Sequence, residues 1–165
     1  MEELISQIKK ALDNNLYYLA LLAALTLPDI CGALSSEDGK ATKQRYIEWF
    51  NKYVGEKYKG CLTGEDCYYF RCSFVHQGTS QHPKSNYSRV IFVEPTGTSN
   101  IFHCNILEDA LNIDVRIFVM DILEGVEKWL REVKDTEVFK KNYARFMKRY
   151  PNGLPPYIVG VPVIS

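Results

Sequence analysis

The residues best suited to chemistry lie in one short segment, Tyr69–Gly78, which reads YFRCSFVHQG. It contains Arg71 and, five positions later, His76, among apolar residues and just ahead of a glycine suited to ending a helix. An imidazole exchanges protons near neutral pH, and a guanidinium offers a planar fork of donors to two phosphate oxygens. Such a pair suits RNA cleavage, in which a 2′-hydroxyl attacks phosphorus and negative charge develops in the transition state.

An Arg and a His separated by four to six residues at a helix end form the motif of the HEPN superfamily, which this segment resembles. The resemblance covers about residues 1–150 and implies a helical bundle with metal-independent endoribonuclease activity and no cofactor. It implies that His76 is the general acid/base and Arg71 the phosphate anchor. It also implies a homodimer whose two motifs face each other, and a toxin or defence role with an antitoxin-type protein partner.

Two positions depart from the family pattern. Cys72 follows the arginine, where the family commonly has a polar residue such as Asn, and Gln77 separates His76 from Gly78. A non-catalytic RNA- or nucleotide-binding or protein-interaction module on the same fold is therefore the alternative.

Arg71 and His76 are also about 140° apart around an ideal helix. They meet either at the last helical turn or across a dimer axis.

The residues around the motif are candidates for holding substrate. A polar, mildly basic run follows it, and the predicted substrate-binding residues are His82, Lys84, Arg89 and Ser73. A solvated loop is the competing interpretation of this run. A second candidate RNA surface is the last predicted helix, in which Tyr143 and Phe146 alternate with basic residues. An ordinary helix with aromatic residues in the core explains that pattern as well.

Thiol or metal chemistry is a further interpretation. Cys72 and His76 are four residues apart and share a helix face, and other ligands could come from Cys67, His82, His103 and Cys104. No spacing matches a zinc signature, so we expect no metal site. Five cysteines without a Cys-x-x-Cys pair argue against a disulfide framework and favour reduced thiols.

Length and charge limit the class of protein. The 165 residues fit one domain, residues 1–165, and the formal net charge of zero excludes nucleic-acid binding through a broad basic surface. The acidic start has no signal-peptide pattern, and the apolar stretch 16–27 is shorter than the roughly 20 residues of a membrane span. The expectation is a cytoplasmic protein without a membrane segment.

The pattern of apolar residues predicts a mainly α fold, a bundle of four or five helices with an inserted β-hairpin, and the resemblance implies that this bundle is HEPN-like. Helical spacing predicts helices over 2–13, 16–27, 42–54, 64–76, 114–134 and 137–150, with a kink or a new turn at Pro28. The hairpin spans about 88–106, with strands 89–94 and 100–106. The extended tail, 154–165, lies along the body or adds an edge strand. A third functional interpretation is a structural or regulatory dimer assembled through the hairpin and the apolar segment Tyr157–Ile164.

Overall fold

The computed structural model describes residues 1–95 and 101–165. Within these residues the chain forms six α-helices, one 3-10 helix and seven short strands, so the predicted mainly α class is confirmed. The helices are α1 (Glu2–Asp13), α2 (Tyr17–Leu34), α3 (Lys43–Tyr53), η1 (Gly55–Tyr58), α4 (Gly64–Gln77), α5 (Val115–Val133) and α6 (Glu137–Tyr143).

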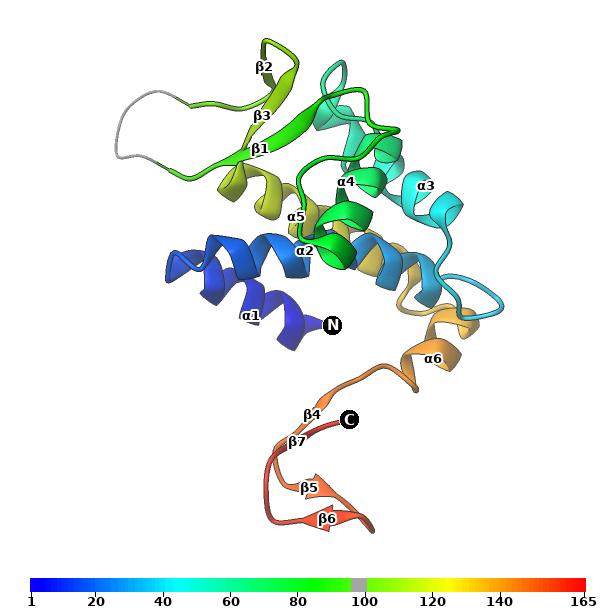
Figure 1. Ribbon diagram of the computed structural model, residues 1–165. Helices are drawn as coiled ribbons and strands as arrows, with labels where there is room; N and C mark the ends of the chain where they lie inside the picture. The colour runs from blue at the N-terminus through cyan, green and yellow to red at the C-terminus, as the bar shows by residue number, and fades with distance from the viewer. Residues whose placement is uncertain (96–100) are drawn as a thin grey trace.

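Helix α2 is the centre of the helical body, as its nearly all-round apolar sequence predicts. It packs against α1, α3, α4, α5 and α6 (Figure 1). Pro28 lies inside it without ending it, and the helix continues to Leu34. By length and composition α2 is long and apolar enough to cross a membrane, but half of it is buried by the other helices. The buried half of α2 faces the hydrophobic core between the helices.

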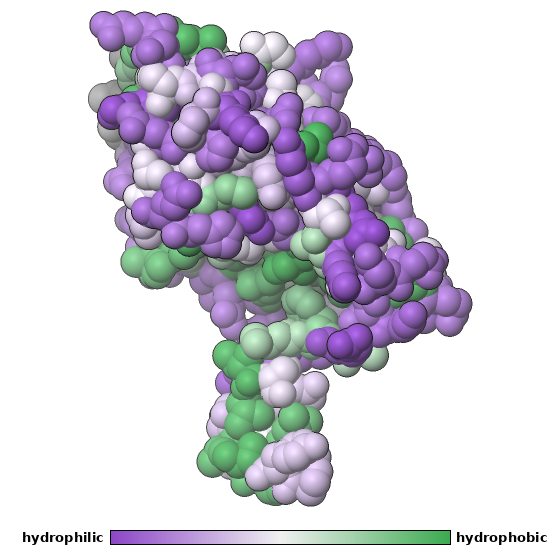
Figure 2. All heavy atoms as spheres, turned by 45° about the vertical axis from the view of Figure 1, so that its right-hand side comes forward, coloured by the Kyte–Doolittle hydropathy of each residue, from purple (hydrophilic) through white to green (hydrophobic). Residues whose placement is uncertain are grey.

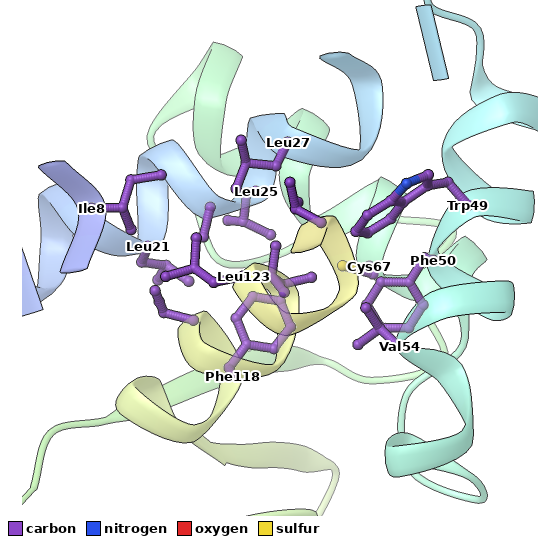
Figure 3. Close-up of a cluster of buried hydrophobic side chains, with 14 of the residues drawn as sticks. Ile8, Leu21, Leu25, Leu27, Trp49, Phe50, Val54, Cys67, Phe118 and Leu123 are labelled. Carbon is purple, nitrogen blue, oxygen red and sulfur yellow. The ribbon is translucent and has the colours of Figure 1, made fainter. Parts of the chain in front are cut away.

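The hydrophobic core lies between α2, α3, α4 and α5 (Figure 3). Leu25 of α2, Phe50 of α3 and Phe118 of α5 are all fully buried there. Helix α5 approaches α3 closely at Gly125, where an added Cβ would lie 2.9 Å from Cγ2 of Val54. A larger residue at this position would displace the Val54 side chain, so the glycine allows this close approach.

A three-stranded sheet covers one end of the body. It consists of β1 (Arg89–Val93), β3 (Ala110–Asp114) and β2 (Asn105–Leu107), in that spatial order. β1 runs parallel to β3, and β2 runs antiparallel to it. The predicted pairing of strand 89–94 with strand 100–106 is therefore wrong, because β3 lies between them. Of the turn expected between these two strands, 95–99, all but Pro95 lies outside the described residues, as does Asn100.

The burial of β3 explains this arrangement. Leu111 and Ile113 are fully buried, whereas Ile106 and Leu107 of β2 are half exposed. The strand with the apolar inner face takes the central position, and the exposed strand takes an edge. β3 then leads directly into α5, whose first turn is capped by the Asp114 carboxylate accepting from the Ile117 amide.

The end of the chain also differs from the prediction. The helix expected over 137–150 stops at Tyr143, and Arg149–Tyr150 forms strand β4, which pairs with β7 (Val163–Ile164). Beyond it, β5 (Gly153–Leu154) pairs with β6 (Ile158–Val159). The tail thus pairs with itself and adds no strand to the main sheet. Lys148 and Arg149 lie outside the helix, so the predicted basic helical surface does not form.

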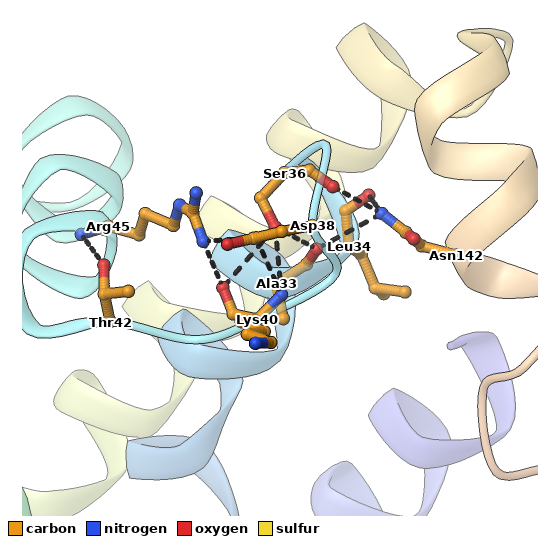
Figure 4. A network of polar contacts seen from close by, with 8 residues as sticks. All are labelled: Ala33, Leu34, Ser36, Asp38, Lys40, Thr42, Arg45 and Asn142. Atoms are coloured by element: carbon orange, nitrogen blue, oxygen red, sulfur yellow. Dashed lines mark hydrogen bonds and ion pairs between the residues drawn. The ribbon is translucent and has the colours of Figure 1, made fainter.

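A polar network fixes the place from which this end segment leaves the body (Figure 4). The side-chain amide of Asn142 in α6 donates to the carbonyl oxygens of Ala33, Leu34 and Ser36 at the end of α2. On the other side of the same loop, Arg45 donates to the Asp38 carboxylate and to a backbone carbonyl. These bonds satisfy helix-end carbonyls of α2 and attach α6 to it.

Cys61 and Cys104 form a disulfide bond. The expectation that all thiols are reduced is therefore wrong for this pair, while Cys31, Cys67 and Cys72 are free. The bond joins the connection between η1 and α4 to the segment before β2. Sequence spacing could not reveal it, because the two residues are 43 positions apart and meet only through the fold.

Candidate functional site

Helix α4 carries the Arg71–His76 motif and has well-defined ends. At its start the Thr63 hydroxyl accepts from the Asp66 amide and caps the helix. At its end Gly78 has a φ of +66°, and the amides of Gly78 and Thr79 donate to the carbonyls of Phe74 and Ser73. The bond from the Gly78 amide to the Phe74 carbonyl is that of an αL C-cap. It places His76 in the last turn, at the exposed end of the helix.

Arg71 and His76 meet within one chain. Nη1 of Arg71 lies 3.3 Å from Nε2 of His76. Because a guanidinium only donates hydrogen bonds, this contact requires His76 Nε2 to act as the acceptor. Of the two arrangements expected from the sequence, the structure has the one in which the side chains converge at the last helical turn.

The third member of the group is Asp29, which the sequence analysis did not identify. Its carboxylate forms an ion pair with Nη2 of Arg71, and the two side chains are only 11% and 17% exposed. Burial raises the pKa of Asp29 above its ordinary value, and the Arg71 guanidinium works against that rise. One signal was present in the sequence, since Asp29 is the only charged residue between Asp13 and Glu37.

Aromatic and cationic groups continue from Arg71 along α4. The Arg71 guanidinium carbon lies 5.8 Å from the centre of the Tyr68 ring, and Lys43 Nζ lies 4.4 Å from the centre of the Tyr69 ring. The Tyr69 ring stacks on the His82 ring with centres 4.5 Å apart and planes 12° apart. Stacked rings beside cations form a surface on which a nucleobase could lie near the Arg71–His76 pair.

A buried carboxylate holds the loop that brings His82 to this surface. Asp66 accepts from the backbone amide of Asn86 at 3.1 Å and from its side-chain amide at 3.0 Å. Within the loop, the Lys84 amide donates to Nδ1 of His82. The loop is thus held on α4 by the Asn86–Asp66 hydrogen bonds and by the stacking of His82 on Tyr69, while Lys84 itself is exposed.

The predicted substrate-binding residues divide into two groups. Within the described chain, His82 contacts α4 directly, and Lys84 belongs to the same loop. Ser73 is fully buried, and its hydroxyl faces the interior without a hydrogen-bond partner among the described residues. It cannot reach a substrate without a rearrangement. Arg89 is exposed at the start of β1, on the sheet rather than on α4.

The alternative metal ligands and thiols do not assemble. Cys104 is bonded to Cys61, and Cys67 lies in the core beside Tyr46, where burial raises the pKa of its thiol to about 12. Cys72 accepts a weak contact from Arg71 Nη1 at 3.7 Å. Among residues 1–95 and 101–165, no three His, Cys, Asp or Glu side chains gather as metal ligands would.

The site is therefore a half-buried Asp29–Arg71 ion pair that ends in an exposed histidine and lies next to a surface of stacked rings. Its contacting groups come from α2, α3, α4 and the loop after α4. Comparison of the chain with protein-family models, with curated proteins and with solved structures gives no match.

Proposed function

We propose that this protein is a metal-independent endoribonuclease of the HEPN type that acts as a homodimer, with Arg71 and His76 at the site of cleavage. The observation that carries the proposal is the 3.3 Å contact between Arg71 Nη1 and His76 Nε2 at the exposed end of α4. It brings a proton-transfer group and a permanent cation to one point on the surface.

The proposed reaction needs no group beyond these side chains and water. His76 takes the proton from a ribose 2′-hydroxyl, the oxygen attacks the adjacent phosphorus, and the bond to the 5′-oxygen breaks. The departing 5′-oxygen takes up a proton, supplied in a dimer by the second His76. The products are a 2′,3′-cyclic phosphate and a 5′-hydroxyl. Arg71 Nη1 turns from the imidazole to the phosphate oxygens, on which negative charge develops.

Asp29 acts in this proposal as a positioning residue. It occupies Nη2 of Arg71 and thereby fixes the plane of the guanidinium, leaving Nη1 directed at His76. Holding a long side chain in one orientation before the substrate arrives reduces the entropy lost on binding. The surface formed by Tyr69 and His82 would then hold a base of single-stranded RNA, since stacking tolerates any sequence.

A second candidate is a non-catalytic RNA- or nucleotide-binding module. The observation that favours it is the Asp29–Arg71 ion pair, which neutralises much of the charge that a phosphate would meet. The stacked rings would still bind a base without any cleavage.

The biological setting is proposed from the HEPN resemblance alone. It is a toxin or defence role in the cytoplasm, held in check by an antitoxin-type partner. Disulfides are rare in that compartment, so the assay needs both the oxidised protein and the protein with Cys61–Cys104 reduced.

The test is cleavage of single-stranded RNAs in EDTA by the wild type and by Arg71→Ala and His76→Ala. Each substitution is expected to lower the rate by about 10²- to 10⁴-fold, with cyclic phosphate ends on the wild-type products. Arg131→Ala, an exposed arginine of α5, is the matched control and should cleave like the wild type. Melting curves verify that each variant is folded.

Asp29→Asn provides a finer test, because the amide oxygen can still accept from Arg71. We expect kcat to fall about tenfold with KM and melting temperature near the wild-type values. RNA binding without cleavage by the pure wild type would favour the second candidate, and cleavage that survives both alanine substitutions would exclude the proposed site.

A further inference from the structure

The last part of the chain forms a narrow ribbon that projects from the body (Figure 1). We call residues 149–165 the arm. Its two ends are joined at its base, where the Lys148 amide donates to the Ser165 carbonyl at 2.7 Å and the Ser165 amide donates back at 2.9 Å. Farther out, the Gly160 amide donates to the Asn152 carbonyl. The arm is thus a paired structure with a fixed starting point.

The composition of the arm does not suit a surface that remains in water. Residues 150–165 contain no charged side chain. In Figure 2, hydrophobic residues (green) cover much of the arm. Tyr157 is 85% exposed, Val159 70% and Ile164 67%. Six of the fifteen large apolar side chains that are exposed in the described chain lie within Met147–Ser165. Large apolar patches of this kind mark interaction surfaces.

A groove lies at the base of the arm, between α1 and the segment after α6. Its volume is about 570 Å³, and its apolar lining comes from Met1, Leu4, Ile30, Phe146, Met147 and Ile164. Charged residues of both signs border it, with Glu2 and Glu3 on α1 and Lys148 and Arg149 on the other side. The arm and the groove therefore form one continuous surface that is apolar within and charged at its edge.

We propose that this surface binds a second copy of the chain, so that the arm of each copy packs against the groove region of the other. In a two-fold symmetric interface the same patch appears on both copies and must complement itself. Glu2 and Glu3 line the groove from α1, and Lys148 and Arg149 line it from the segment after α6. A two-fold axis that exchanges these two sides would bring the carboxylates of each copy to the cations of the other, as the requirement demands.

The size and charge of the surface favour a copy of the chain over other occupants. A stable interface takes about 800 Å² from each partner, and the exposed apolar side chains of Tyr157, Val159 and Ile164 extend the apolar lining of the groove along the arm. Nucleic acid would require cations along the arm, which has none beyond Arg149. At an anionic membrane, repulsion of Glu2 and Glu3 would offset the attraction of Lys148 and Arg149, so the charges at this edge give no net attraction.

The first experiment measures molar mass by light scattering and sedimentation from about 1 to 100 μM, the range that covers micromolar affinities. The wild type is expected to dimerise. Tyr157→Ser combined with Val159→Ser should weaken the dimer at least tenfold, and the monomer should remain folded because both side chains are exposed. Met120→Ser, an exposed apolar residue of α5, is the matched control and should leave the dimer intact.

Reversing the charges on one side of the groove at a time tests whether the arm and groove contact a second copy of the chain. One variant carries Glu2→Lys and Glu3→Lys, the other Lys148→Glu and Arg149→Glu. Each alone should stay monomeric, and an equimolar mixture of the two should form a heterodimer. A wild type that remains monomeric at the highest concentration would overturn the proposal, as would a dimer that is unaffected by the arm substitutions.

Binding of a monomeric wild type to phosphatidylcholine–phosphatidylserine vesicles, lost in the serine variant, would overturn the proposal as well and would assign the arm to lipid. The readout is independent of RNA cleavage, because none of the substituted residues belongs to the Arg71–His76 site. Dimerisation through the arm without RNA cleavage would support this inference and contradict the proposed function. RNA cleavage by a dimer that forms without the arm would do the reverse.

Discussion

The body around α4 and the arm differ in how far their apolar side chains are buried and in how many charged side chains they contain. In the body, apolar residues such as Phe118 are buried and a charged residue such as Asp29 has an ionic partner. In the arm, Tyr157 and Val159 face solvent, and residues 150–165 carry no charge at all. The body buries its apolar side chains within the chain, whereas the arm leaves its apolar side chains exposed. In the proposed dimer, stability and assembly would therefore depend on different parts of one chain.

The largest expected contrast is between core and arm substitutions. Phe118→Ala should lower the free energy of unfolding by about 3–5 kcal/mol, because it empties a fully buried site. Tyr157→Ala should change it by no more than about 0.5 kcal/mol in the monomer. Urea unfolding at low protein concentration measures both. A large loss for Tyr157→Ala in the monomer would show that the arm stabilises its own body and would break the contrast.

The second contrast concerns cross-linking, since Cys61–Cys104 ties the sheet end to the body and the arm has no such bond. Replacing both cysteines with alanine should lower the free energy of unfolding by about 2–4 kcal/mol, because the open chain regains the entropy of a long loop. Dithiothreitol should lower the free energy of unfolding of the wild type by a similar amount and should leave that of the double variant unchanged. Cys72→Ala, which removes a free cysteine, should retain the full response to reductant.

The smallest expected effect is a pH dependence at His103, next to that disulfide. Burial lowers the pKa of His103, against the raising influence of Asp121 and Asp114. The folded protein then binds this proton more weakly than the unfolded chain does. The contribution of His103 to stability is complete above about pH 6.5 and declines as the pH falls through the lower folded value.

Melting temperatures between about pH 7.5 and pH 5 test this linkage. The wild type should lose more stability over that interval than His103→Gln, which cannot take up the proton. Equal slopes for the two proteins would mean that His103 is as easily protonated in the folded protein as in the unfolded one. Tyr157→Ala, in the arm, should keep the wild-type slope.

The sequence by itself determined most of the helices, the two ends of α4 and the presence of Arg71 and His76 on that helix, and it left open whether these two side chains meet within one chain or across a dimer axis. These features depend on residues a few positions apart: Thr63 caps its own helix, Gly78 ends it, and the apolar spacing of α1, α3 and α5 selects their buried faces. The long apolar run that became α2 identified the central helix, because no side of it could face water without cost.

Only the tertiary structure decided which distant residues became partners. Asp29 reaches Arg71 across 42 positions, β3 displaces the predicted strand pairing, Cys61 meets Cys104, and the segment after Tyr143 pairs with the C-terminal strand instead of continuing α6. Local spacing carries no information on these choices, because each is set by the competition among all surfaces that could be buried together. Helix formation is decided within a few turns, but partner choice is a property of the whole packed chain.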